Sequence, residues 1–65
     1  MPRQRLIECR RNKQWTQRRV GELVGLTKQA VSDIERGRRN PSYKVAQQLE
    51  GIFGVEHHEL FAEHE

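Results

Sequence analysis

The chain has 65 residues and a net charge of +3 at pH 7, and 34% of its residues are hydrophobic. A chain this short buries only about 60% of its unfolded surface, so we expect one small domain that a partner subunit would stabilise. No apolar run has the length of a membrane span or a secretion signal, and the single cysteine excludes an internal disulfide. These features predict a soluble chain in the cytoplasm.

The charge is divided unevenly along the chain. All 12 Lys and Arg lie in residues 1–44, whose four acids leave a net charge of +8, whereas residues 45–65 hold five acids and no Lys or Arg. A basic segment is typical of a nucleic-acid footprint, a membrane-surface patch or an ordinary solvated face. We favour nucleic acid, because no segment of the basic half combines a cationic face with a lipid-facing apolar one.

The first helix is expected over residues 3–12. Leu6 and Cys9 share one face of it, with Arg10 beside them, whereas Arg3 is expected in solvent.

Two short helices separated by a tight turn are predicted next. Thr16 and Thr27 are suitable N-caps for helices over residues 17–24 and 28–36. Gly25 can adopt the left-handed conformation that ends the first of the two. A helix, a turn of about three residues and a second helix make a helix-turn-helix motif, which lays its second helix in the DNA major groove.

The packing around this motif is predicted from two residues. Trp15 is interpreted as a hydrophobic staple against Val20 or the helix below, and base stacking is the alternative that duplex DNA disfavours. Gly21 lies inside a helix, where it costs roughly 0.5–1 kcal/mol relative to Ala. We therefore expect the two helices to approach each other too closely there for a side chain.

The second helix of the motif has one apolar and one polar face. Ala30, Val31 and Ile34 recur at helical spacing and are expected to pack on the preceding helix. The opposite face is polar and follows the i, i+3, i+4, i+7 pattern: Gln29, Ser32, Asp33 and Arg36. An ordinary amphipathic surface helix is the alternative, because this period is common.

The first turns of both helices carry cations where helix stability favours acids. Arg18 and Arg19 follow Thr16, and Lys28 follows Thr27. Helix N-termini carry partial positive charge, so each exposed cation there is unfavourable by roughly a few tenths of a kcal/mol. A bound phosphate reverses that balance, because exposed N–H groups, the helix dipole and a basic side chain then attract the same anion.

A charged loop and a fourth helix are predicted after Gly37. Pro41 disfavours helical geometry at the residue before it, and Ser42 can cap a helix over residues 43–53. That helix is expected to bury Val45, Ala46, Leu49, Ile52 and Phe53. The loop places three polar side chains beside the DNA backbone, unless it is an ordinary solvated loop: Arg38, Arg39 and Asn40.

The last segment, residues 55–65, is predicted to form a short fifth helix. Its apolar residues are Val55, Leu60 and Phe61, and its histidines are His57, His58 and His64. The histidines share no single i, i+4 face and lack the H-E-x-x-H spacing, so no metal site is predicted. Because the chain also lacks a phosphate-binding glycine loop and a nucleophile with a base, we expect neither an enzyme nor a cofactor.

Six short motifs occur along the chain in a specific order and spacing: Thr16-Gln17, Gly21, Gly25-Leu26-Thr27, Ile34-Glu35-Arg36-Gly37, Asn40-Pro41-Ser42 and Phe53-Gly54-Val55. Together they make nearly the whole chain similar to the Cro/XRE family of helix-turn-helix transcriptional regulators, in particular its short single-domain members. The resemblance implies one all-α, lambda-repressor-like domain over residues 1–65, with five short helices and the helix-turn-helix at about 16–37. It also implies a bacterial, archaeal or phage protein of the cytoplasm or nucleoid.

The resemblance further implies roles for individual residues. Arg10 and Glu35 occupy places where the family has an internal ion pair, with Arg10 near enough to the DNA to touch a phosphate. Cys9 stands where the family usually has a leucine, so we interpret it as a small core residue in preference to a reactive thiol. Glu50 stands where the family usually has a small apolar residue. The end of the fourth helix and the fifth helix often form the dimer contact, so residues 50–65 supply candidates for a homodimer, weighed evenly against ordinary core: Ile52, Phe53 and Phe61.

Double-stranded DNA is the predicted partner, with separate residues for phosphates and for base edges. The phosphate candidates are Arg10, Gln17, Arg18, Arg38, Arg39 and Asn40, and the base-reading candidates are Thr27, Lys28, Gln29, Ser32 and Asp33. Lys28 suits guanine, Gln29 suits adenine, and Asp33 either accepts from a cytosine amino group or orients Arg36. We therefore expect a sequence-specific transcriptional regulator, most simply a repressor reading operator half-sites.

Two other functions are compatible with the sequence. An antitoxin or an adaptor-type protein-interaction module could use the same fold, and the acidic second part of the chain supports this alternative. A sequence-tolerant RNA or nucleoid binder would need only the basic face.

Overall fold

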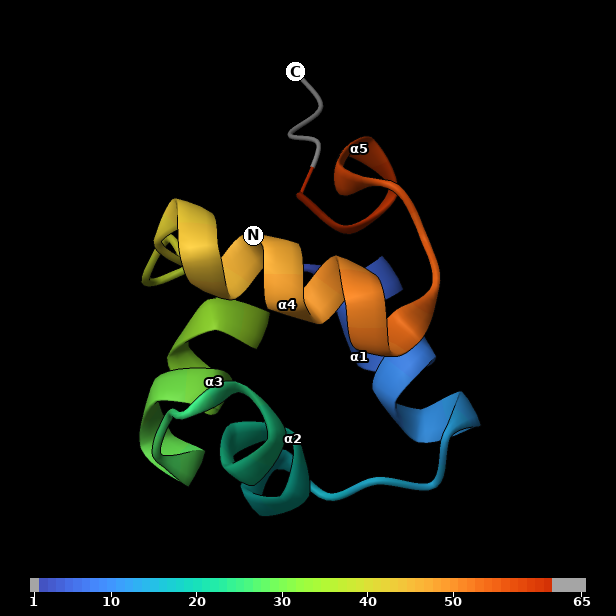
Figure 1. Cartoon of the computed structure of the whole chain (residues 1–65). Coiled ribbons are helices and arrows are strands. Elements are labelled where there is room, and N and C mark those ends of the chain that lie inside the picture. Colours follow the sequence, from blue (N-terminus) through green and yellow to red (C-terminus); the bar gives the residue numbers. More distant parts are fainter. Residues whose placement is uncertain (1, 62–65) are drawn as a thin grey trace.

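A computed structural model describes residues 2–61, and these residues form five α-helices (Figure 1). In chain order they are α1 Gln4–Asn12, α2 Gln17–Val24, α3 Lys28–Glu35, α4 Tyr43–Phe53 and α5 His57–Phe61. The predicted all-α fold is confirmed. α1 starts one residue later and α3 ends one residue earlier than expected. α5 starts at His57 and not at residue 55, and residues 62–65 of its predicted range lie outside the described residues. Within residues 2–61, no helix is long and apolar enough to cross a membrane.

The helices begin and end where local chemistry predicts. A side-chain oxygen accepts the backbone N–H three residues on at Thr16, Thr27 and Ser42, over 3.0, 3.1 and 3.2 Å. Each of these bonds satisfies one of the N–H groups that a helix start leaves without an intrahelical partner. Gly25 ends α2 in the left-handed conformation, with φ at 77°. The turn between α2 and α3 is therefore built from the residues that the sequence pattern indicated.

The core receives apolar side chains from all five helices. Helices α2 and α3 pack together most extensively, and α4 contacts both α2 and α5. Figure 1 shows α4 crossing the molecule with α2 on one side and α5 on the other. Cys9 is buried in the core, as predicted. The buried cluster consists of Leu6, Cys9, Val20, Val24, Val31, Ile34, Leu49, Phe53 and Leu60.

Two packing predictions are refined by the structure. The ring of Trp15 lies against Phe53 of α4, with 5.8 Å between the ring centroids. A Cβ atom at Gly21 would overlap the backbone carbonyl oxygen of Leu26. The close approach at Gly21 therefore exists, but its partner is the turn that leads into α3 and not the body of that helix.

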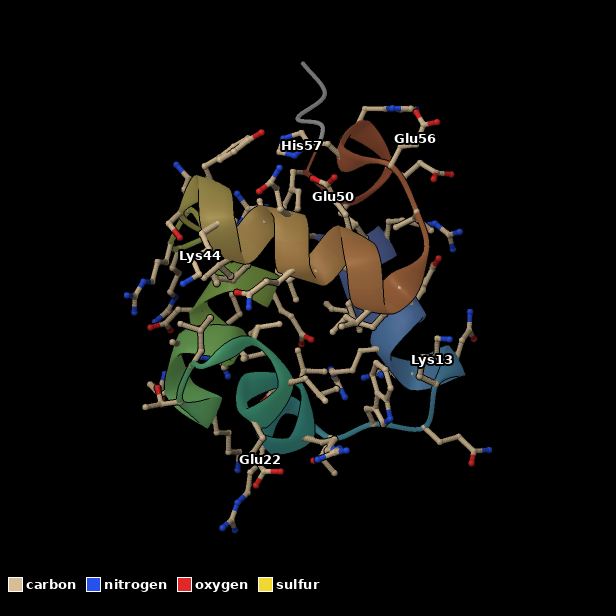
Figure 2. The ribbon with its side chains drawn as sticks, viewed as in Figure 1. Lys13, Glu22, Lys44, Glu50, Glu56 and His57 are labelled. Atoms are coloured by element: carbon tan, nitrogen blue, oxygen red, sulfur yellow. The ribbon has the colours of Figure 1, made fainter. Side chains whose placement is uncertain are left out.

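The polar residue Glu50 is accommodated on α4 by a partner on α5. Its carboxylate oxygen Oε2 lies 2.8 Å from Nδ1 of His57, and Figure 2 shows the two labelled side chains close together between α4 and α5. The ring of His57 also meets that of Phe61, with centroids 5.0 Å apart. His58 lies 3.6 Å from Glu56, and His64 is outside the described residues. The pair between Glu50 and His57 therefore links the fourth and fifth helices.

Candidate nucleic-acid interface

The exposed start of α3 carries the residues best placed for contact with a partner. Thr27, Lys28 and Gln29 are all exposed there. Asp33 is half-buried, and its Oδ1 accepts a hydrogen bond of 3.2 Å from Nε2 of Gln29. Since residues four apart are neighbours on a helix surface, these two side chains form one polar unit. The partner of Asp33 is thus Gln29 and not the predicted Arg36.

Ser32 does not belong to this exposed row. Only 7% of its surface is accessible. The prediction that Ser32 lies on the solvent face of the helix is therefore wrong. Ser32 lies three residues before Glu35, which is also buried, and the two are neighbours on the helix surface. A small side chain at the edge of a polar face is easily covered by its surroundings, and periodicity alone does not show this.

A surface hollow joins the start of α2 to the start of α3. It is lined by Arg10, Thr16, Gln17, Arg18 and Lys28. Three of these five side chains are cationic, and the N-terminus of α2 adds its partial positive charge. A hollow of this composition suits a phosphate group, which would receive N–H donors and cations together. The structure therefore gathers three phosphate candidates with Lys28, which was assigned to base reading.

Arg10 and Gln17 are held in this hollow by Glu35. Nε of Arg10 donates to Oε2 of Glu35 over 2.5 Å, and Nε2 of Gln17 donates to Oε1 over 2.9 Å. A further N–H of Arg10, at Nη1, donates to the carbonyl oxygen of Trp15 over 3.0 Å. The Glu35 side chain is only 4% exposed. The ion pair implied by the family resemblance is therefore present, and Gln17, predicted only as a phosphate contact, is also part of its network.

The loop after α3 holds the remaining phosphate candidates. Arg38, Arg39 and Asn40 are all exposed. Behind them lies Arg3, which is only 9% exposed, so the prediction that Arg3 is in solvent is wrong. Nη2 of Arg3 donates to Oδ1 of Asn40 over 2.7 Å, and Nη1 donates to the carbonyl oxygen of Arg39 over 3.1 Å. One side of Asn40 is thus engaged within the chain.

Sequence reasoning placed Arg3 in solvent because it lies off the Leu6 and Cys9 face of the helix predicted over residues 3–12. In the structure α1 begins at Gln4, and Arg3 precedes it. No signal in the sequence indicated the contact that Arg3 makes, because its partner at the end of α3 lies 31 residues away. Nη1 of Arg3 donates to the carbonyl oxygen of Ile34 over 2.7 Å.

One of the three dimer candidates differs from the other two in its environment. Phe53 is part of the core, with 9% of its surface accessible. Ile52 and Phe61 are half-buried and pack against the edge of the same cluster. Of the two roles weighed for Phe53, the structure assigns it the intrachain one.

Two helices joined by a tight turn, with a cationic hollow at the start of the first and an exposed polar row on the second, define a helix-turn-helix domain of the DNA-binding type. The sequence profile of the Helix-turn-helix family, Cro/C1-type XRE group, matches residues 6–60. The chain belongs to this family of DNA-binding transcriptional regulators.

Several known proteins resemble the chain. The HTH-type transcriptional regulator PuuR of Escherichia coli is 39% identical over 64 residues, which are 98% of this chain and 35% of PuuR. The uncharacterized HTH-type transcriptional regulator y4dJ of Sinorhizobium fredii is 43% identical over 51 residues, covering 78% of this chain and 66% of the relative. This chain therefore spans about a third of the length of PuuR.

A solved structure has the same fold. The restriction-modification controller protein C.AhdI from Aeromonas hydrophila superimposes with a TM-score of 0.77 at 38% sequence identity. The match covers 89% of this chain and 88% of that protein.

Proposed function

We propose that the chain represses transcription by binding operator DNA as a homodimer, with α3 of each subunit in the major groove. The observation that carries this proposal is the exposed row Thr27, Lys28 and Gln29 at the leading end of α3, beside the cationic hollow at the start of α2. In helix-turn-helix proteins the first residues of the second helix contact base edges, while the first helix crosses the backbone. In this chain the exposed row lies at the start of the second helix, α3, and the cationic hollow lies at the start of the first helix, α2.

The phosphate contacts come from the two ends of α3. Arg10, Gln17 and Arg18 line the hollow near the start of the helix. The loop residues Arg38, Arg39 and Asn40 lie at the other end of the helix and are exposed. Two such groups would hold α3 in a fixed register along the groove, because phosphate contacts orient a protein without reading sequence.

The base contacts come from Lys28 and Gln29. Lys28 suits the O6 and N7 acceptors of guanine, and the carboxamide of Gln29 suits N6 and N7 of adenine. Asp33 accepts one N–H of Gln29 in the free protein, which leaves the second N–H and the carboxamide oxygen for a base. We assign Asp33 the role of orienting Gln29, in place of a direct contact with cytosine.

The homodimer is supported by size and by the surface of α4 and α5. A domain of 65 residues has a small core, which a second copy would extend. Ile52 and Phe61 present partly exposed apolar surface at the end of α4 and on α5. Figure 1 shows α5 on the side of α4 away from α2, so a second copy there would leave the helix-turn-helix free. Transcriptional control is supported by PuuR, a regulator by name, and by C.AhdI, a controller protein.

The experiment is selection of bound sites from random duplex DNA, with sizing of the complex and transcription from a promoter that carries the selected site. We expect a two-fold symmetric site with half-sites about 34–36 Å apart, bound by two subunits, and reduced transcription. Equal affinity for all random duplexes at physiological salt would contradict sequence-specific binding. Co-purification of a protein partner without any binding to DNA would contradict the proposal as a whole.

A further inference from the structure

Arg3 connects three segments that are distant in the sequence. Its guanidinium donates to the carbonyl oxygen of Ile34 over 2.7 Å, at the end of α3. The same group donates to the carbonyl oxygen of Arg39 over 3.1 Å and to Oδ1 of Asn40 over 2.7 Å, both in the loop after α3. The ring of Phe61 on α5 lies 5.7 Å from the guanidinium carbon. The first residues of the chain thus meet the end of the helix-turn-helix.

The chemistry of these contacts favours arginine. The carbonyl groups at the end of a helix carry partial negative charge, which a cation stabilises. The backbone N–H of Arg3 adds a hydrogen bond of 2.7 Å to the carbonyl oxygen of Glu35. Because only 9% of Arg3 is exposed, water competes little for its donors. The planar guanidinium presents several N–H groups at fixed angles, which the ammonium of lysine cannot imitate.

The loop after α3 is bonded both to that helix and to Arg3. Gly37 turns the chain with φ at 80°, and the backbone N–H of Arg38 donates to the carbonyl oxygen of Asp33 over 2.9 Å. Beyond that bond, Arg3 holds the backbone of Arg39 and the side chain of Asn40. The side chains of Arg38 and Arg39 are exposed, and the backbone that carries them is bonded to Arg3 at residue 39.

We propose that Arg3 is a positioning residue for DNA binding, which locks the loop of residues 38–40 to the end of α3 so that its arginines meet the phosphate backbone. The inference rests on the proposed function. Arg3 itself need not touch DNA, since it acts through the loop. The ring of Phe61 lies over the guanidinium, so Arg3 also contacts α5.

The test is a double-mutant cycle between Arg3→Lys and Arg39→Ala, read by DNA affinity at several salt concentrations. Arg3→Lys keeps the net charge, so a change in salt dependence reports the placement of other cations. Arg5→Lys is the matched control, because Arg5 is exposed on α1 and lies 3.6 Å from Glu8 as a surface pair. Circular dichroism at the assay temperature shows that each variant is folded.

We expect Arg39→Ala to weaken binding about tenfold in the wild-type background and less than about twofold in the Arg3→Lys background. Arg3→Lys should lower the slope of log affinity against log salt by about one to two, and Arg5→Lys should leave it unchanged. If Arg3→Lys does not fold, Asn40→Ala replaces it in the cycle, because it removes the loop end of the same contact. Asn40 is itself a proposed phosphate contact but carries no charge, so its own loss weakens binding without changing the salt slope. A lowered slope in Asn40→Ala therefore reports displaced arginines, and an unchanged slope would overturn the positioning role.

An additive cycle with an unchanged salt slope in Arg3→Lys would overturn the positioning role while leaving the proposed function intact. A wild-type protein that binds no duplex DNA would overturn the proposed function, and the role of Arg3 with it. The two failures are therefore distinguished by the wild-type titration.

Discussion

Arg10 of α1 and Glu35 of α3 form an ion pair with 2.5 Å between Nε and Oε2, and the carboxylate is almost completely enclosed. Gln17 at the start of α2 donates to the second oxygen of the same carboxylate. Three helices of the domain therefore meet at one buried charge. This junction sets the position of the cationic hollow at the start of α2 relative to the exposed row on α3.

Removing Arg10 should destabilise the fold strongly. Arg10→Ala leaves Glu35 buried without its cation, a change that costs about 3–5 kcal/mol. In a domain of this size each kcal/mol lowers the melting midpoint by about 4–8 °C. Thermal unfolding followed by circular dichroism should therefore show a large fall in the midpoint. Arg11→Ala removes the same charge from an exposed position on α1 and serves as the control. Equal midpoints for the two variants would exclude a structural role for the pair.

Gly21 and Gly51 both lie within helices. Replacing each by alanine should change the stability of the fold in opposite directions. Gly21→Ala brings a Cβ atom into the carbonyl oxygen of Leu26, so the turn must shift, at a cost of about 1–3 kcal/mol. Gly51→Ala on α4 meets no atom within 4 Å and should stabilise by about 0.5–1 kcal/mol. Urea denaturation of both variants measures the difference. A stabilised Gly21→Ala would show that the turn adjusts freely.

Gln29 and Arg39 should differ in their effect on sequence preference. Gln29→Ala should remove about 1–3 kcal/mol of discrimination at a single base position. Arg39→Ala should weaken binding to all sequences alike and lower the salt slope by about one. Titrations of the selected site and its single-base variants, at several salt concentrations, separate the two outcomes. Equal loss of discrimination in both variants would mean that base reading and positioning have been assigned wrongly.

Asp33 should act through Gln29. If it orients the carboxamide, Asp33→Ala relaxes preference at the same base position as Gln29→Ala, and the double variant is no worse than Gln29→Ala alone. The same set of single-base variants provides the measurement. Relaxed preference at a different base pair would instead indicate a direct contact between Asp33 and a cytosine.

Ile52 should report on the dimer. Ile52→Asp places a charge on the partly exposed end of α4, so the protein should sediment as a folded monomer that binds its site more weakly. Gln47→Asp introduces the same charge at an exposed position of the same helix and should leave the dimer intact. Analytical ultracentrifugation with circular dichroism checks both variants. A wild-type protein that is monomeric at the concentrations used for DNA binding would refute this assignment.

The local signals in the sequence were sufficient for the helices. Thr16, Thr27 and Ser42 cap helices as expected, because a cap depends only on residues within one turn. Gly25 adopts the left-handed conformation for an equally local reason. The family motifs then implied the contact between Arg10 and Glu35, which no local rule could have joined across 25 residues.

Tertiary packing decided which polar side chains remain available. Ser32 and Gln29 share a face by periodicity, yet one is covered and the other exposed. Arg3 and Arg5 have the same charge and are two residues apart in the sequence. Arg3 is nevertheless enclosed by α3, the loop and α5, whereas Arg5 is exposed. The sequence by itself determined the five helices, their caps and the basic character of one half of the chain, because these follow from interactions over a few residues. Only the tertiary structure decided which arginines support the interface from within and which face a partner, because burial depends on segments that meet only when the chain folds.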